Sequence, residues 1–146
     1  MNPIGYVKNG VENKKDVSWG NDVSTIILNE EYHGGLNGLE EFSHVTIIYY
    51  LEKANFDRDK HLQRRPQNRD DMPLVGILSQ RGKDRPNQIG MTSVQIVSVS
   101  DNELTVKGLD AIDGTPILDI KPYYPVYDQK EANVPEWVQR LMEHYF

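Results

Sequence analysis

Apolar and polar positions alternate along most of the chain, in short segments that end at turn residues. Seven segments are rich in Val, Ile, Thr and Tyr, the residue types that fit a pleated, half-buried surface. They span residues 3–8, 24–28, 45–51, 74–79, 92–100, 104–109 and 117–121. Because almost no long helical pattern separates them, we predict a mainly β fold, an antiparallel single-sheeted β-barrel.

One pair of these segments carries a hairpin pattern. Residues 94–99 alternate between apolar and polar positions with a single slip, and Asp101-Asn102 supplies turn residues before the next apolar run at 104–107. Two alternating runs joined by such a short turn are typical of a β-hairpin. We therefore expect these two segments to pair directly.

Two short helical patterns complete the predicted elements. Residues 37–42 suit one helical turn ahead of the strand at 45–51. Pro135 stands where a first helical residue is favoured, and a short C-terminal helix should follow it. Its apolar face, which we expect to pack on the sheet, consists of Trp137, Val138, Leu141 and Tyr145.

The length of 146 residues indicates one domain over 1–146, with enough chain to bury a core. The absence of cysteine excludes disulfides, thiolate metal sites and a cysteine nucleophile. No apolar run approaches the roughly 20 residues of a membrane span, and residues 1–6 lack a signal-peptide pattern. We expect a cytoplasmic protein with no membrane partner.

Histidine spacing argues against a metal centre. None of the four histidines has another at i+2 or i+4, the spacings that place two ligands side by side. We predict no metal site.

Basic residues are concentrated in one region of an acidic chain. The net charge is −6, yet residues 53–85 hold nine of the 16 Lys and Arg residues and only five acids. A locally basic loop suits contact with a polyanion, since phosphate contacts require Lys and Arg. The alternative is a solvated polar loop, and the long polar connection at 57–72 fits either interpretation.

Residues 113–123 combine two acids, a lysine, a tyrosine and a glycine turn around a short apolar strand. An acid within such a strand is costly to bury unless another group pairs with it. Asp119 and Lys121 either satisfy each other in a tight hairpin or belong to a functional site.

Several of these segments occur together in one order. They are residues 38–44, Arg65-Pro66, residues 76–81, Arg85-Pro86-Asn87, residues 109–116 and Pro122-Tyr123. Over residues 3–128 the chain resembles the TrmO family, S-adenosyl-L-methionine-dependent tRNA methyltransferases of single-sheeted β-barrel fold. The resemblance implies a homodimer that methylates N6 of threonylcarbamoyladenosine at position 37, in the anticodon loop of tRNA.

The resemblance also implies site residues. The cofactor-binding residues would be Ser18, Trp19, Arg85, Asn87, Ala111, Ile112, Asp113 and Gly114. The catalytic residues would be Asp119, Lys121 and Tyr123. The RNA-binding residues would be Arg64, Arg65, Arg69 and Lys83.

Some choices stay open. Asp113 or Asp119 could accept the N6 proton, or both could bind the cofactor. Gln88 stands where the family usually has proline. The alternative functions are a non-enzymatic module that binds S-adenosyl-L-methionine and a methyltransferase with another acceptor.

Overall fold

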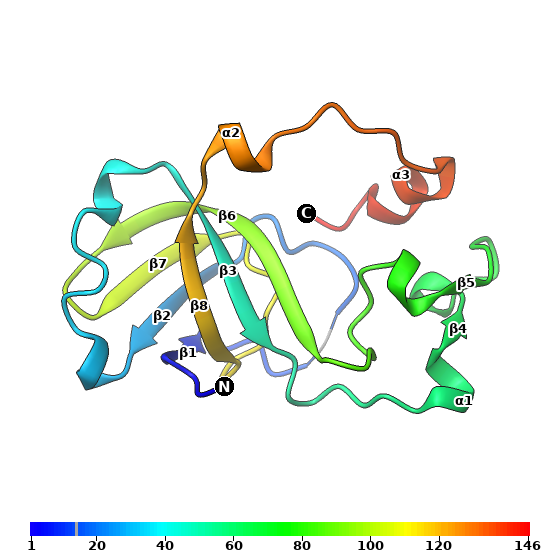
Figure 1. Ribbon diagram of the computed structural model, residues 1–146, viewed down its shortest axis with the longest axis horizontal. Coiled ribbons are helices and arrows are strands. Elements are labelled where there is room, and N and C mark those ends of the chain that lie inside the picture. Colours follow the sequence, from blue (N-terminus) through cyan, green and yellow to red (C-terminus); the bar gives the residue numbers. More distant parts are fainter. Residues whose placement is uncertain (14) are drawn as a thin grey trace.

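Six antiparallel strands close into a barrel in the computed structural model, which describes residues 1–13 and 15–146 (Figure 1). The strands are β1 (Gly5–Lys8), β2 (Val23–Leu28), β3 (His44–Tyr50), β6 (Ile89–Val99), β7 (Glu103–Lys107) and β8 (Pro116–Pro122). Their order around the barrel is β1-β2-β7-β6-β3-β8, and β8 pairs with β1 to complete the circle. The predicted antiparallel β-barrel is confirmed.

The barrel interior is filled by alternate residues of its strands. In β3, Val45, Ile47 and Tyr49 are buried, whereas the outward-facing Tyr50 is 40% exposed. The core also includes side chains from the other strands and from two loops: Val7, Ile26, Leu28, Leu36, Leu39, Val94, Leu104, Val106, Leu109, Ala111 and Ile117. Alternation along a strand places every second side chain on one face, so these apolar residues meet inside the barrel.

The predicted β6–β7 hairpin is confirmed, and the slip in its alternation is a β-bulge. The register of β6 against β7 shifts between Ile96 and Ser98, which leaves Val97 53% exposed. An extra residue in one strand turns the following side chains to the other face. The slip in the sequence pattern therefore marks the position of the bulge.

The prediction of a seventh barrel strand at residues 74–79 is wrong. Only β5 (Val75–Gly76) is extended there; it pairs with β4 (Gln63–Arg64) outside the barrel, and the next residues form the 3₁₀ helix η4 (Ile77–Ser79). This segment belongs to an excursion between β3 and β6, residues 51–88. The excursion also contains α1 (Arg58–His61) and the 3₁₀ helix η3 (Pro66–Asn68).

The excursion has a small packed centre of its own. Met72 and Ile77 are each 1% exposed, and neither belongs to the barrel core. Buried Gln80 donates hydrogen bonds to the carbonyls of Arg64 (3.1 Å) and Val75 (3.3 Å). Apolar burial and a satisfied amide together give this polar region a defined shape.

The remaining helices are short. The helical turn predicted at 37–42 is confirmed as the 3₁₀ helix η2 (Leu39–Glu41), and η1 (Glu30–Tyr32) precedes it. After β8 come α2 (Pro125–Asp128) and α3 (Glu136–Met142), so the predicted C-terminal helix is present. None of these helices is long and apolar enough to cross a membrane within residues 1–13 and 15–146.

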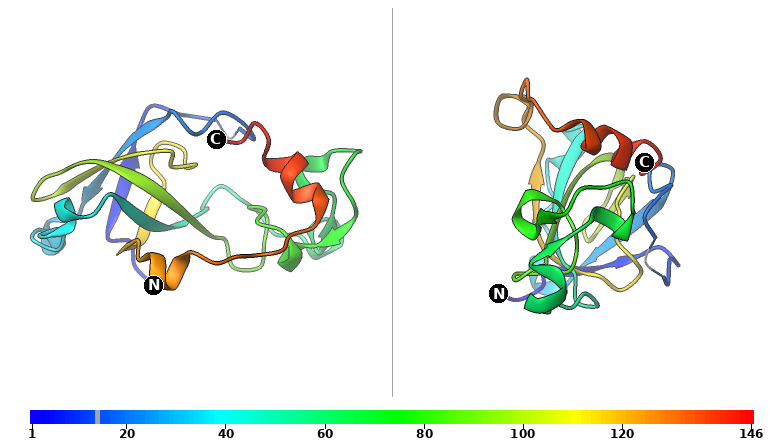
Figure 2. Two further views of the ribbon diagram at one scale, coloured as in Figure 1. Left: turned by 90° about the horizontal axis from the view of Figure 1, so that it is seen from above. Right: turned by 90° about the vertical axis from the view of Figure 1, so that its right-hand side faces the viewer.

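The predicted packing of α3 on the barrel sheet is wrong. This helix lies beside the excursion, away from the barrel (Figures 1 and 2). Nη1 of Arg140 donates to the carbonyl of Asp71 at 2.7 Å. The apolar face of Trp137, Val138 and Leu141 is only half-buried. A helix of seven residues offers a narrow apolar face, which can pack against any nearby apolar surface.

Candidate functional site

A cavity of about 920 Å³ lies where the barrel rim meets the excursion and the C-terminal segment. This volume falls within the roughly 300–1,000 Å³ that is usual for small-molecule sites. Both apolar and polar side chains line it, among them Trp19, Leu51, Lys83, Ile112 and Leu141. The cavity therefore draws on four parts of the chain that are far apart in sequence.

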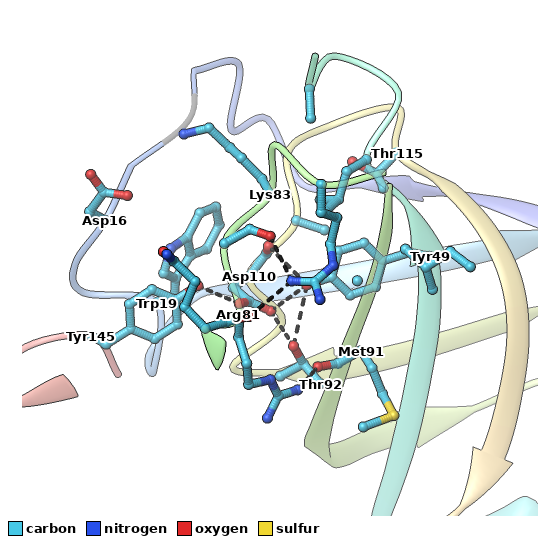
Figure 3. Close-up of a pocket in the computed structure, with 18 of the residues that line it drawn as sticks. Asp16, Trp19, Tyr49, Arg81, Lys83, Met91, Thr92, Asp110, Thr115 and Tyr145 are labelled. Atoms are coloured by element: carbon cyan, nitrogen blue, oxygen red, sulfur yellow. Dashed lines mark hydrogen bonds between the residues drawn. The ribbon is translucent and has the colours of Figure 1, made fainter. Parts of the chain in front are cut away.

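A carboxylate held by three hydroxyl groups stands in this cavity (Figure 3). Oη of Tyr49 donates to Oδ1 of Asp110 at 2.8 Å, and Oγ1 of Thr92 donates to the same oxygen. Oη of Tyr145 donates to Oδ2. Hydrogen bonds to an ionised acceptor are stronger than neutral ones, so the three donors fix the carboxylate in place.

Strand geometry brings these donors together. Tyr49 in β3 and Thr92 in β6 lie on paired strands, while Asp110 follows the buried Leu109 just after β7. Tyr145 comes from the C-terminal segment. Burial raises the pKa of Tyr49 and of Tyr145 well above the ordinary tyrosine value, and the nearby Asp110 carboxylate adds to both shifts. Both phenols therefore stay protonated and act as hydrogen-bond donors.

The loop that carries Asp110 is attached to the start of the chain. Nδ2 of Asn9 donates to the carbonyl of Ala111 at 2.7 Å and to Oγ of Ser24 at 3.0 Å. Oδ1 of Asp113 accepts from the backbone amides of Asn9 at 2.8 Å and of Gly10 at 3.3 Å. These contacts hold residues 109–115 against the barrel and so set the direction of the cavity wall.

Two arginines shape the opposite wall. Nη1 of Arg85 donates to the carbonyls of Gln80 (3.0 Å) and Gly82 (3.1 Å), which closes the loop that connects the excursion to β6. Nη2 of Arg81 donates to the carbonyl of Met91 at 2.5 Å (Figure 3). The positive charge of Arg81 acts against the rise in the pKa of Tyr49, so this guanidinium lies within electrostatic reach of the hydroxyl network.

The structure brings some of the predicted cofactor-binding residues to the cavity. Those that line it are Trp19, Arg85, Asn87, Ala111 and Ile112. Ser18, Asp113 and Gly114 are not among the lining residues. Asp113 instead binds the amides of the N-terminal loop, and Ser18 binds the carbonyl of His144 through its own amide at 2.8 Å. Asp113 and Ser18 therefore support the cavity from outside.

The predicted catalytic residues divide in the same way. Tyr123 lines the cavity, whereas Asp119 and Lys121 do not. Nζ of Lys121 lies 3.0 Å from Oδ2 of Asp119, and both side chains are about half exposed or more. The structure thus supports the simpler alternative for this pair, two adjacent charges that satisfy each other on the outside of β8.

All three of the predicted RNA-binding arginines have contacts within the chain. Nη1 of Arg64 lies 3.1 Å from Oδ2 of Asp84, Arg65 donates to the carbonyl of Met72, and Arg69 pairs with Asp71 at 2.7 Å. Arg64 and Lys83 line the cavity, but Arg65 and Arg69 do not. Substitution of these arginines would therefore disturb the excursion as well as any RNA contact.

Sequence reasoning missed the centre of the site. The pattern-based prediction does not include Asp110, Tyr49, Thr92 or Tyr145 in the site, although one signal for Asp110 is present. Asp110 immediately follows the buried Leu109, shortly after β7 ends, and a polar residue just beyond a strand often faces a site. The role of Tyr145 had no local signal, because its partner is 35 residues away.

The described residues do not suggest a metal centre. Within residues 1–13 and 15–146, no group of three or more His, Cys, Asp or Glu side chains is arranged to hold a metal ion. The hydroxyl-bound carboxylate and the surrounding cations suit an organic ligand that combines positive and negative groups.

A β-barrel with a ligand-sized cavity at its rim, completed by an excursion between β3 and β6, defines the structural class. Residues 14–129 match the family model described as the tRNA-methyltransferase O N-terminal domain. The chain belongs to this family.

Archaeal proteins of comparable length are among the relatives. A probable S-adenosyl-L-methionine-binding protein of Pyrococcus abyssi is 35% identical over 143 residues, which cover 94% of this chain and 75% of the relative. An S-adenosyl-L-methionine-binding protein of Archaeoglobus fulgidus is 36% identical, over 88% of this chain and 91% of the relative. The human tRNA (adenine(37)-N6)-methyltransferase is 35% identical over 92% of this chain but 32% of its own length.

A solved structure agrees with the fold. The crystal structure of TrmO from Pseudomonas aeruginosa superposes with a TM-score of 0.75 at 27% identity, over 93% of this chain. The chain spans 60% of the length of that protein.

Proposed function

We propose that this protein is an S-adenosyl-L-methionine-dependent methyltransferase that acts on N6 of adenosine 37 in tRNA. The observation that supports this proposal most directly is the Asp110 carboxylate, which three hydroxyl groups hold inside the cavity. The segments that resemble the family, at residues 85–87 and 111–112, line the same cavity. Family membership and the names of the relatives agree with this activity.

The chemistry of the cavity fits the cofactor. A sulfonium is a cation, which a carboxylate attracts, and Asp110 lines the cavity. Arg81 would bind the carboxylate of the methionine part. Ala111 and Ile112 would provide an apolar wall for the adenine ring. When bound, the cofactor supplies an activated methyl group, so the protein needs no covalent nucleophile of its own.

The protein's task is to orient the acceptor and to accept one proton. Transfer forms an N–CH₃ bond, breaks the S–CH₃ bond with its electron pair left on sulfur, and releases the N6 proton. Of the three candidates Asp110, Asp113 and Asp119, only Asp110 lines the cavity, and we assign to it the role of facing that proton. A hydrogen-bond acceptor at N6 increases the electron density on nitrogen.

The acceptor that we propose is threonylcarbamoyladenosine in an anticodon loop. Loop bases can be splayed out and inserted into a pocket, and the cavity is large enough to receive one beside the cofactor. The cavity lining also includes Lys53 and Lys83, whose charges suit a backbone phosphate or the carboxylate of the threonyl group.

Methyl transfer from radiolabelled S-adenosyl-L-methionine to bulk tRNA tests this function. We expect label on tRNA that carries the threonylcarbamoyl group and none on tRNA that lacks it. Label on both would indicate a wider acceptor range. Cofactor binding without transfer to either tRNA would overturn the tRNA assignment and favour a binding module or another acceptor.

We also propose a homodimer in the cytoplasm, where tRNA substrates are present. Light scattering on the purified protein would give the mass in solution. A mass equal to a single chain at micromolar concentration would exclude the stable dimer.

A further inference from the structure

The C-terminal segment forms one wall of the cavity. We call residues 136–146 the strap; it follows the long connection after α2 and includes α3. Leu141, Met142, Tyr145 and Phe146 line the cavity. The match to the family model ends at residue 129, before the strap begins.

Three separate contacts attach the strap. At its start, Nη1 of Arg140 donates to the carbonyl of Asp71 in the excursion at 2.7 Å. Near its end, the carbonyls of His144 and Tyr145 each accept, at 2.8 Å, from the backbone amides of Ser18 and Trp19. The third contact is the hydrogen bond from Tyr145 to Asp110 inside the cavity (Figure 3).

The approach of the strap to the N-terminal loop is close. A Cβ atom placed on Gly20 would lie 2.5 Å from the backbone carbonyl carbon of Phe146. The Phe146 ring packs edge-on against the ring of Tyr145, with centroids 4.8 Å apart. The backbone contacts and this ring pair together direct the Tyr145 hydroxyl toward the interior of the cavity.

The two oxygens of Asp110 depend on different parts of the chain. Oδ1 accepts from Tyr49 and Thr92, which belong to the barrel and are both buried. Oδ2 accepts from Tyr145. The barrel therefore determines where the carboxylate lies, while the strap determines how its second oxygen is held.

We propose that Tyr145 is a positioning residue, carried by the strap, that fixes Oδ2 of Asp110 and closes the cavity over its ligand. Ligand entry and release then require the strap to leave Ser18, Trp19 and Asp110. The identity of that ligand rests on the proposed function, but strap closure can be measured without it.

Tyr145→Phe tests the proposal, because this substitution removes the hydroxyl and keeps the ring. The first readout is hydrogen exchange of the Ser18 and Trp19 amides, which are protected only while the strap is closed. A hydrogen bond to a charged group has the strength to slow opening by about tenfold or more. We expect exchange at these two amides to accelerate by about that factor, while amides of β3 and β6 exchange as before.

The second readout is binding of S-adenosyl-L-methionine. We expect Tyr145→Phe to raise the dissociation constant by about tenfold. Arg140→Gln detaches the other end of the strap without touching Asp110; it should accelerate amide exchange with a much smaller loss of affinity. Tyr127→Phe, at a tyrosine that is 73% exposed, is the matched control and should change neither readout.

Each outcome has a distinct meaning. Unchanged exchange at Ser18 and Trp19 in Tyr145→Phe would overturn the closing role. Equal losses of affinity in Tyr145→Phe and Arg140→Gln would mean that the strap only covers the cavity. They would overturn the proposal that Tyr145 acts by positioning Asp110. If the unmodified protein did not bind S-adenosyl-L-methionine, the proposed function would fail, while the exchange measurement would still decide whether the strap closes.

Discussion

The Asp113 carboxylate accepts hydrogen bonds from the backbone of a loop that is distant in sequence. Oδ1 accepts from the amides of Asn9 and Gly10, and these bonds lower the pKa of Asp113 below its usual range, against a smaller opposing effect of desolvation. The carboxylate is thus a structural connection between residues 109–115 and the N-terminal loop. Its contribution to the site is indirect, through the position of the neighbouring cavity wall.

This connection should depend on pH. Since the pKa is lower in the folded state than the unfolded value of about 3.9, its stabilising contribution is present above that value and is lost as the pH falls through the folded pKa. The amide shifts of Asn9 and Gly10, followed by NMR from about pH 5 to about pH 2, should report that loss. Asp113→Asn should abolish the transition; a midpoint at or above the unfolded value would contradict the assignment.

Arg85 has two carbonyl partners within its own loop, so its substitution should affect both shape and binding. Each hydrogen bond from a charged donor is worth about 1.5–3 kcal/mol. We expect Arg85→Ala to lower the free energy of unfolding by about that amount and to weaken cofactor binding, measured by urea unfolding and calorimetry. Arg58→Ala, at an exposed position of α1, is the control.

The two readouts separate the roles of Arg85. Loss of affinity at unchanged stability would mean that its guanidinium contacts the ligand directly. No change in either quantity would remove Arg85 from the cavity wall.

At the scale of elements, the contact between β3 and β6 carries the Tyr49 hydroxyl into the site. Tyr49 pairs with Gly90 across the two strands. A Cβ atom on Gly90 would overlap the ring of Tyr49. Glycine at this position therefore gives the tyrosine ring the space to reach Asp110.

Gly90→Ala should displace this ring. Overpacking of a buried site typically costs about 1–3 kcal/mol, and we expect a loss of that size in urea unfolding, together with weaker cofactor binding. Gly76→Ala in β5 is the matched control, because its Cβ atom would meet only the carbonyl of Leu62, at 3.9 Å. Equal stability of the two variants would show that the Tyr49 ring adjusts without cost.

At the scale of the whole molecule, the basic residues are concentrated toward one end of the long axis. The barrel occupies one end and the excursion the other, with the strap beside the excursion (Figures 1 and 2). Residues 53–85 contain nine of the 16 basic residues of a chain with net charge −6. A polyanion should therefore approach from the excursion side of the cavity.

The salt dependence of tRNA binding tests that approach. Each phosphate contact adds about 0.7–0.9 to the slope of log affinity against log salt. We expect Lys83→Ala, at the cavity rim, to reduce the slope by about one such contact. Lys107→Ala, at an exposed position of β7 on the barrel, should leave it unchanged. Equal slopes in the two variants would place the RNA elsewhere.

Much of the fold could be predicted because alternation is a local property. Six of the seven predicted strands are barrel strands, and the slip in residues 94–99 is a bulge. The prediction of a barrel strand at 74–79 is wrong because an apolar run does not show which segment it will pack against. Its Ile77 is buried in the centre of the excursion, not in the barrel.

The sequence by itself determined the six segments that form barrel strands and the region where basic residues are concentrated, since these depend on neighbouring residues. Only the tertiary structure decided that Asp110, and not Asp119, lines the cavity and is held there by three hydroxyl groups. It also decided that Tyr145 reaches this carboxylate across 35 residues. These groups come together because the barrel closes and because the strap packs against the N-terminal loop. Neither event leaves a pattern in the sequence of the segments that it joins.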